Sequence, residues 1–244
     1  MKGVVLAGGL GTRLLPLTKI TNKHLLPIYD KPMIYYPLQT LINAGIKDIM
    51  VVTGGNNAGD FLRLLGNGKQ FGLKDISYTY QEGEGGIAEA LNLAEDFADG
   101  EKILVILGDN IIEKNIIKER ERFENQKEGA MILIKDVSHP EHFGVPELNG
   151  NKVIGIEEKP SKPKSQYAVI GIYMYDSRVF DIIKTLKRSD RGELEITDVN
   201  NAYINDGTMT CSKLNGWWID AGSSPEHLAE ATQLVIKTGA NALT

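Results

Sequence analysis

The chain has 244 residues, of which 42 % are hydrophobic and 24 % are charged, a composition typical of one globular domain with a buried core. Its formal net charge of −5 argues against a nucleic-acid-binding or anionic-membrane-binding protein, because both need a basic face. With Cys211 as the single cysteine, neither an internal disulfide nor a cysteine-based metal site can form. The sequence contains no apolar run long enough for a membrane span or a signal-peptide core, so we expect a cytoplasmic protein.

Strands and helices are predicted to alternate in the first half of the chain. Apolar, β-branched stretches predict strands at 4–7, 48–53, 76–80, 103–107 and 130–134. Apolar periodicity predicts helices at 32–44, 58–65, 87–97 and 115–125. Pro32 suits the first turn of its helix, and Gly45 suits the residue that ends it. This order predicts an α/β fold with an open, doubly wound, mostly parallel sheet.

The second half of the chain is richer in short strands. We expect strands at 152–157, 168–175, 209–214 and 217–219, and helices at 179–186, 196–204 and 225–236. Ser224 is a plausible N-cap of the last helix. We interpret these elements as additions to the same sheet plus a small β-rich part. The chain is then a single domain, 1–244, with halves of about 1–135 and 136–244.

A glycine-rich loop, Gly8-Gly9-Leu10-Gly11-Thr12-Arg13, directly follows the first strand. Glycines let the backbone approach a phosphate, and an arginine fork suits a polyphosphate. The loop lacks the third glycine of the dinucleotide fingerprint, and Gly11 is not followed by the Lys-Ser/Thr of the Walker pattern. The same residues are also typical of an ordinary strand-to-helix turn with no ligand. Taken alone, Lys23 is a surface lysine and His24 a structural histidine.

Two aspartates follow apolar strands, Asp109 after 103–107 and Asp220 after 217–219. The carboxyl ends of parallel strands form the ligand-binding edge of such a sheet, and two carboxylates there could share one Mg²⁺. Each aspartate could instead cap a loop or a helix.

Two further polar positions follow strands. Glu158-Lys159 suits a sugar phosphate, or is a charged surface turn before Pro160. Gln81 offers the donor and acceptor that match the O4/N3 edge of thymine or uracil, or is a solvated strand end.

A series of motifs in this order carries a family resemblance. They are G-G-x-G-T-R-L (8–14), K-x-L-L-P (23–27), K-P-M-I-Y-Y-P (31–37), L-G-D-N (107–110), F-G-V (143–145), E-E-K-P (157–160), Y-A-V (167–169), R-G-E-L-E-I-T-D (191–198) and W-I-D-A-G (218–222). Together they resemble the sugar-nucleotide pyrophosphorylases, and within that family the glucose-1-phosphate thymidylyltransferases, which start dTDP-rhamnose synthesis. The resemblance covers nearly the whole chain.

The resemblance implies a Rossmann-like nucleotidyltransferase fold and a homo-oligomer. It implies that the enzyme transfers deoxythymidylate from dTTP to glucose 1-phosphate by in-line displacement, with Mg²⁺ as cofactor and pyrophosphate as the second product. Residues 1–135 would then form the nucleotide-binding half, and 136–244 the sugar-binding half. The VIG sequence at 169–171 departs from the family's more usual V-T-G, and Arg191 stays unassigned.

The resemblance also implies a set of site residues. Catalysis would use Arg13, Lys23, Asp109 and Lys159. The nucleotide would contact Leu6, Gly8, Gly9, Gly11, Thr12, Arg13, Gln81, Gly86 and Asp109. The sugar phosphate would contact Gly144, Glu158, Lys159, Val169 and Tyr173. The metal ligands would be Asp109 and Asp220.

Several alternatives stay open at this point. A uridylyltransferase is consistent with the same motifs, because thymine and uracil share the edge that Gln81 would recognise. A guanylyltransferase for a mannose phosphate is a more distant possibility. A non-catalytic sugar-nucleotide-binding relative is the alternative outside enzymes, although such a protein would be free to lose Arg13, Lys23 or Asp220. The resemblance is to short members, without the C-terminal helices that longer ones use for a regulatory nucleotide site.

Overall fold

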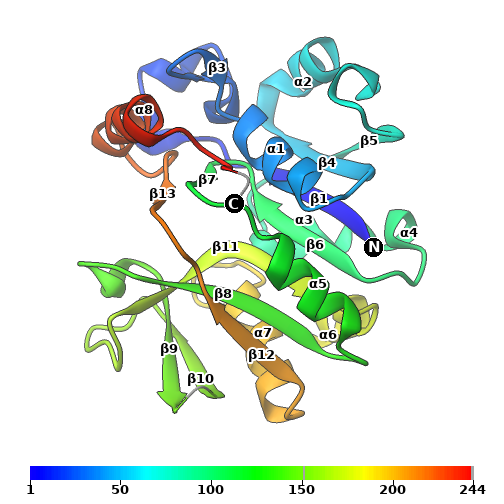
Figure 1. Cartoon of the computed structure of the whole chain (residues 1–244), viewed down its shortest axis with the longest axis vertical. Helices are drawn as coiled ribbons and strands as arrows, with labels where there is room; N and C mark the ends of the chain where they lie inside the picture. The colour runs from blue at the N-terminus through cyan, green and yellow to red at the C-terminus, as the bar shows by residue number, and fades with distance from the viewer. Residues whose placement is uncertain (151, 243–244) are drawn as a thin grey trace.

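The computed structural model describes residues 1–150 and 152–242. Within these residues, nine strands form one mixed sheet in the order β10-β9-β11-β6-β1-β4-β5, with β8 paired to β11 and β12 paired to β8 (Figure 1). The strands are β1 (Lys2–Ala7), β4 (Asp48–Gly54), β5 (Asp75–Gln81), β6 (Ile103–Leu107), β8 (Ala130–Asp136), β9 (Gly144–Asn149), β10 (Lys152–Glu158), β11 (Tyr167–Tyr175) and β12 (Met209–Lys213).

The four strands β6, β1, β4 and β5 run parallel, so their carboxyl ends lie at one edge. Strand β11 then runs antiparallel to β6 and continues the sheet into the second half of the chain. The expected open, mostly parallel α/β sheet is confirmed, and the second half adds strands to it.

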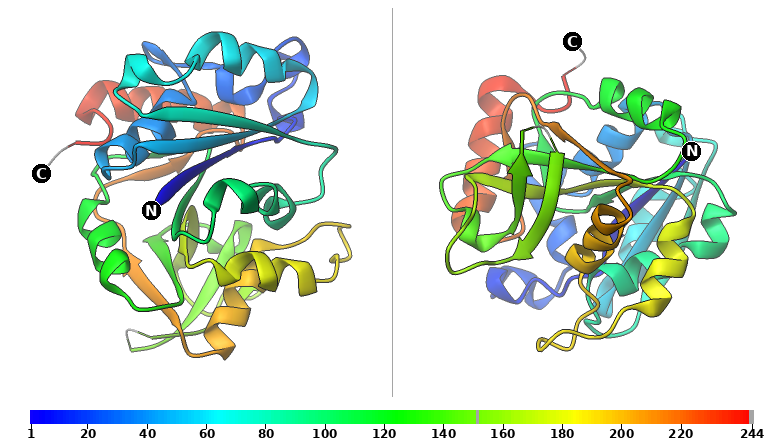
Figure 2. Two further views of the ribbon diagram at one scale, coloured as in Figure 1. Left: turned by 90° about the vertical axis from the view of Figure 1, so that its right-hand side faces the viewer. Right: turned by 90° about the horizontal axis from the view of Figure 1, so that it is seen from below.

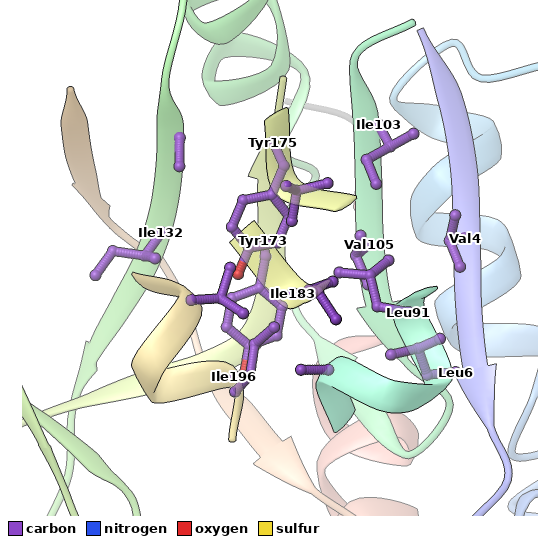
Figure 3. Close-up of a cluster of buried hydrophobic side chains, with 14 of the residues drawn as sticks. Val4, Leu6, Leu91, Ile103, Val105, Ile132, Tyr173, Tyr175, Ile183 and Ile196 are labelled. Atoms are coloured by element: carbon purple, nitrogen blue, oxygen red, sulfur yellow. The ribbon is translucent and has the colours of Figure 1, made fainter. Parts of the chain in front are cut away.

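Helices cover both faces of this sheet (Figure 2). They are α1 (Tyr35–Asn43), α2 (Ala58–Leu65), α3 (Ile87–Asn92), α4 (Glu95–Ala98), α5 (Ile117–Asn125), α6 (Arg178–Thr185), α7 (Ile196–Asn205) and α8 (Pro225–Thr238). Successive side chains of a strand point to opposite faces of the sheet and pack in different core clusters. Val4 packs with α3, α6 and α7, whereas Val5 packs with α1, α2 and α5. Figure 3 shows the first cluster, in which Leu91, Ile183 and Ile196 cover the sheet.

Two small strand pairs lie outside the main sheet. Strand β7 (Asn110–Ile112) pairs antiparallel with β13 (Trp218–Asp220), and β2 (Pro27–Ile28) pairs with β3 (Lys31–Pro32). Helix α8 packs on both pairs through a third apolar cluster. The β7–β13 pair joins segments more than 100 residues apart, at the ligand edge of the sheet.

Three sequence predictions need correction. The first helix begins at Tyr35, not at Pro32, because the β2–β3 hairpin takes Pro32 and is tied down by the Met33 N–H to the Leu26 carbonyl. The helix expected at 87–97 is two helices, with a tightened turn in which the Ala94 N–H donates to the Leu91 carbonyl. Strands β2, β3, β7 and β9 were not expected from the sequence. The other predicted elements are confirmed to within two residues at either end.

Candidate active site

The glycine-rich loop leaves β1 at the carboxyl edge of the sheet and turns into a short 3-10 helix at Thr12–Leu14. Gly11 has φ +67°, in the left-handed region that favours glycine, and a Cβ there would lie 2.9 Å from the Lys23 Cβ. A Cβ on Gly54 would lie 2.7 Å from the Gly8 carbonyl oxygen, so the loop packs closely on the end of β4. The glycines therefore let the loop and the Lys23 segment share one small space.

Lys23 begins a second short 3-10 helix, Lys23–Leu25, and its side chain turns inward. Asn22 caps this turn, and its Oδ1 accepts from the His24 backbone N–H and lies 2.7 Å from His24 Nδ1. The Lys23 ammonium lies 2.5 Å from Asp109 Oδ2. Lys23 is therefore part of the site, not a surface lysine.

The β7–β13 pair brings the two aspartates together, because Asp220 stands opposite Asn110 in the ladder. The Ala221 N–H donates to the Asp109 carbonyl oxygen at 2.9 Å, and a Cβ on Gly222 would lie 2.6 Å from Asp109 Oδ2. Asp109 follows β6 by two residues, so the strand-end argument placed it correctly. Asp220, in contrast, comes from β13, which lies outside the main sheet and reaches Asp109 through its pairing with β7.

Opposite charges and burial set the pKa values in this cluster. Burial alone would raise the pKa of Asp109, but the Lys23 ammonium holds it well below its usual range. Burial alone would lower the pKa of Lys23, but Asp109 and Asp220 hold it above its ordinary value. Burial, reinforced by the Asp109 charge, raises the pKa of Asp220 to about 7. The positive charge around Asp220 is therefore too small to stabilise its ionised form fully.

This shortage of positive charge fits a divalent cation. Both candidate ligands offer carboxylate oxygens, which Mg²⁺ prefers. Residues 1–150 and 152–242 contain no group of three or more His, Cys, Asp or Glu side chains arranged for a metal. A cation held by Asp109 and Asp220 would complete its coordination with phosphate oxygens and water.

The cluster lies in a cavity of about 840 Å³ lined by both halves of the chain. The predicted site residues that line it are Leu6, Gly8, Gly9, Arg13, Lys23, Gln81, Gly86, Asp109, Gly144, Glu158, Lys159, Val169, Tyr173 and Asp220. Gly11 and Thr12 do not line it: Gly11 shapes the loop from behind, and Thr12 begins the 3-10 turn. Their individual roles stay predictions.

The second half of the chain contributes acidic and basic side chains to this cavity. Glu158 ends β10, and its Oε2 accepts a 2.6 Å hydrogen bond from the Thr197 hydroxyl. Its Oε1 lies 3.7 Å from the Lys159 ammonium and 3.8 Å from the Arg191 guanidinium. Tyr173 stacks on Tyr175 within the apolar cluster of Figure 3, and burial raises the pKa of its phenol above the usual range. A carboxylate flanked by two cations suits a ligand that carries both hydroxyls and phosphate.

Sequence reasoning missed several residues of the cavity wall. Thr197, Asn200, Trp218 and His24 all line it, and Arg191 reaches it as well. Trp218 Nε1 donates to Asn110 Oδ1 at 2.7 Å, which holds the indole against the start of β7. The R-G-E-L-E-I-T-D motif, which contains Arg191 and Thr197, indicated that this segment belongs to the site. The sequence could not show which of its side chains face the cavity.

The fold therefore places a glycine-rich loop and a pair of aspartates around one cavity at the carboxyl edge of the sheet. The chain belongs to the nucleotidyl transferase family, which it matches over residues 2–238. None of the described helices is long and apolar enough to cross a membrane.

Individual relatives carry a more specific name. A glucose-1-phosphate thymidylyltransferase of Neisseria meningitidis is 46 % identical over 96 % of this chain and 82 % of its own length. One of Mycolicibacterium smegmatis is 44 % identical over the same shares. The solved structure of a candidate glucose-1-phosphate thymidylyltransferase from Bacillus anthracis, in complex with sucrose, is 51 % identical, with a TM-score of 0.93 over 97 % of this chain and 96 % of that one. These findings confirm the family resemblance stated from the motifs.

A more distant structure has the same fold. A UDP-glucose pyrophosphorylase complexed with UDP-glucose is 26 % identical, with a TM-score of 0.84 over 97 % of this chain and 98 % of the other. The likeness extends over both halves of the chain.

Proposed function

We propose that this chain transfers the deoxythymidylyl group of dTTP to glucose 1-phosphate, giving dTDP-glucose and pyrophosphate, as a first step toward dTDP-rhamnose and related deoxysugars. The observation that carries the proposal is the cluster of Lys23, Asp109 and Asp220 at the floor of a cavity shared by both halves. The names of relatives at 42–46 % identity support the choice of base and sugar.

The reaction is one in-line displacement. A phosphate oxygen of glucose 1-phosphate forms a bond to the α-phosphorus of dTTP, and the bond from that phosphorus to the bridging oxygen breaks with its electrons, so pyrophosphate leaves. The attacking oxygen is already anionic at neutral pH, so no general base is needed. The protein's work is positioning and charge neutralisation.

In this proposal the basic residues hold the phosphates. Arg13 lines the cavity beside the glycine-rich loop and would stabilise the leaving pyrophosphate. Lys23, now paired with Asp109, would share its charge with the incoming phosphate and align it for displacement. Gly8, Gly9, Gly11 and Thr12 would present or shape backbone N–H groups around the triphosphate.

Asp109 and Asp220 are the proposed ligands of a divalent cation, and we propose Mg²⁺ as that ion. Nucleotidyl transferases generally use a divalent metal. When bound, such an ion neutralises the charge of the approaching phosphates. The two carboxylates would hold it, and Lys23 keeps Asp109 ionised.

The sugar and the base contact opposite walls of the cavity in this proposal. Glu158 would accept hydrogen bonds from sugar hydroxyls, and Lys159 would meet the sugar phosphate. Gly144, Val169 and Tyr173 would form the rest of that wall. Gln81 and Gly86 would read the pyrimidine, and Leu6 would pack against the nucleoside. We further propose that the protein is cytoplasmic, where its substrates would be found, and that it forms a homo-oligomer, as the family resemblance implies. Gel filtration with light scattering would test the assembly.

Uridylyl transfer is the second candidate. Thymine and uracil present the same O4/N3 edge to Gln81, and the methyl group that distinguishes them is worth only about 1–3 kcal/mol. The UDP-glucose pyrophosphorylase structure with the same fold is consistent with slow use of UTP.

The test is release of pyrophosphate with Mg²⁺ and glucose 1-phosphate, measured in parallel with dTTP, UTP, dCTP, GTP and ATP. We expect dTTP to lead and UTP to follow. A lead by another nucleotide would overturn the proposed base. No release with any of several sugar 1-phosphates would leave the non-catalytic binding protein as the better reading.

A further inference from the structure

The amide of Gln81 has an orientation that its neighbours impose. Gln81 is the last residue of β5, and only 6 % of it is exposed. Its Nε2 lies 3.2 Å from the Gly86 carbonyl oxygen and 3.5 Å from Glu89 Oε1. A carbonyl and a carboxylate are acceptors only. The end of the amide that faces them must therefore be the NH2 group, because an oxygen there would face two other oxygens.

This orientation leaves one group of Gln81 for a ligand. Both amide hydrogens point toward protein acceptors, so the Oε1 atom is the free end. That oxygen lies on the side of the glycine-rich loop, where a Cβ on Gly8 would come within 2.7 Å of it. Gln81 and Gly8 both line the cavity. The pocket therefore offers an acceptor, not the donor–acceptor pair that the sequence suggested.

Glu89 is itself held in place from the second half of the chain. Arg188 Nη2 lies 2.5 Å from Glu89 Oε2 and Arg188 Nη1 lies 2.7 Å from the Gly192 carbonyl oxygen. Two backbone hydrogen bonds hold the segment 188–194 against the loop before α3 and the first turn of α3, Leu194 N–H to Gly85 O and Ala88 N–H to Leu194 O. A Cβ on Gly85 would overlap the Glu89 carboxylate, which shows how closely this side chain folds back over the loop.

We propose that Glu89, anchored by Arg188, is a positioning residue that fixes the Gln81 amide and thereby selects pyrimidines with an N3–H. Thymine and uracil carry a hydrogen on N3 and can donate it to Gln81 Oε1. Cytosine has a bare N3 acceptor, which would face the Gln81 oxygen without a hydrogen between them, an arrangement that costs binding free energy. This inference rests on the proposed function, since it concerns how the same site reads its base.

The deciding variant is Glu89→Gln. Its amide oxygen stays with Arg188, so its NH2 group turns toward Gln81 and favours the flipped Gln81 amide, which presents a donor to the cavity. We expect the ratio of kcat/KM for dTTP to that for dCTP to fall about tenfold, with Gly86 O still opposing a complete flip. The dTTP-to-UTP ratio stays unchanged, because both bases present the same edge.

Two further variants separate an effect on base recognition from general damage to the structure. Glu89→Met removes the carboxylate without supplying a donor, so its dTTP-to-dCTP ratio falls less than that of Glu89→Gln. Glu95→Gln is the matched control: Glu95 forms an exposed 2.5 Å ion pair with Lys184 between α4 and α6, and has no contact with Gln81. This control keeps the wild-type ratio.

Binding of dTTP and dCTP to each variant is also measured by calorimetry, so base preference is recorded apart from turnover. A dTTP-to-dCTP ratio that is unchanged in Glu89→Gln, or that falls together with the dTTP-to-UTP ratio, overturns the inference while wild-type activity with dTTP leaves the proposed function standing. Wild-type protein that neither binds nor turns over dTTP in preference to dCTP overturns both.

Discussion

Two buried carboxylate environments in this chain have opposite designs. Asp176 follows β11 and is 8 % exposed. Its oxygens accept hydrogen bonds from the Gly129 N–H, the Tyr203 hydroxyl, and both the backbone N–H and the Nε of Arg178. Every donor is supplied by the protein, so this aspartate ties α6, α7 and β8 together.

The Asp109–Asp220 pair is less well satisfied. Asp109 accepts from Lys23 Nζ and from Asn110 Nδ2, and the Asp220 carboxylate accepts from the Gly222 N–H at 3.2 Å. Two acids share one ammonium, and the pKa of Asp220 is raised to about 7 by burial and by Asp109. Protein donors surround the carboxylate of Asp176, whereas the Asp109–Asp220 pair has too little positive charge around it, and this difference supports the ligand role that we propose for the pair.

The largest expected effect is that of Asp109→Asn. The variant keeps the shape of the side chain but removes the charge that pairs with Lys23 and that would hold the cation. We expect kcat to fall about a thousandfold, the size seen when a charge-stabilising group is lost from an active site. Steady-state kinetics measures this, and a fall of less than tenfold would remove Asp109 from the machinery.

The same change at the folding carboxylate has the opposite profile. Asp176→Asn replaces one of the two oxygens by an NH2 group, so either the Gly129 N–H and the Arg178 Nε, or the Arg178 N–H and the Tyr203 hydroxyl, face a donor and lose their acceptor. We expect the free energy of unfolding to fall by about 3 kcal/mol, because a buried charged network loses one member. Urea unfolding measures the loss, and kcat at low temperature should stay near wild type, since Asp176 lies outside the cavity lining. A large loss of kcat in folded protein would contradict the division between the two sites.

Sequence reasoning located the elements whose local pattern is strong. Strands such as Ile103–Leu107 are continuous apolar runs, and helices such as Ala58–Leu65 have a clear apolar face. Strand β9 was missed because Gly144–Asn149 contains a proline and little apolar alternation. Strand β7 was missed because its three residues form a ladder only with β13. Such pairing depends on long-range contacts that no local window contains.

The same limit applies to the site. The rule that ligands bind at the carboxyl ends of strands singled out both Asp109 and Asp220, and the structure brings both into one cavity, while their ligand roles stay predictions. Sequence could not show that Lys23 pairs with Asp109, or that Glu89 and Gly86 take both amide hydrogens of Gln81. Those facts depend on side-chain directions after folding, and they decide which polar groups are left for a ligand.

Asp220→Asn sharpens the comparison through stability. Without divalent cation at pH 8, the wild-type protein must bury an ionised Asp220 beside Asp109, so the neutral amide should raise the free energy of unfolding by about 1–2 kcal/mol. Added Mg²⁺ should then stabilise the wild-type protein more than the variant. Thermal melting in chelator and in Mg²⁺ measures both effects. An Asp220→Asn variant that is less stable in chelator and equally stabilised by Mg²⁺ would count against a ligand role.

The smallest effect concerns His24, which lies between the two kinds of site because it is buried like Asp176 yet adjoins Lys23. Burial, reinforced by the Lys23 charge, lowers the pKa of His24 to about 3. The unfolded chain takes up this proton near pH 6.5, so stability is lost as the pH falls from about 6.5 toward 3. Between pH 7 and pH 5.5 the His24 contribution should be a loss of about 1 kcal/mol. His24→Asn keeps an N–H donor near Asn22 but cannot titrate, so urea unfolding at the two pH values should show a smaller loss for the variant. Equal losses would mean that His24 accepts a proton in the folded protein about as readily as in the unfolded chain, which would contradict the lowered pKa.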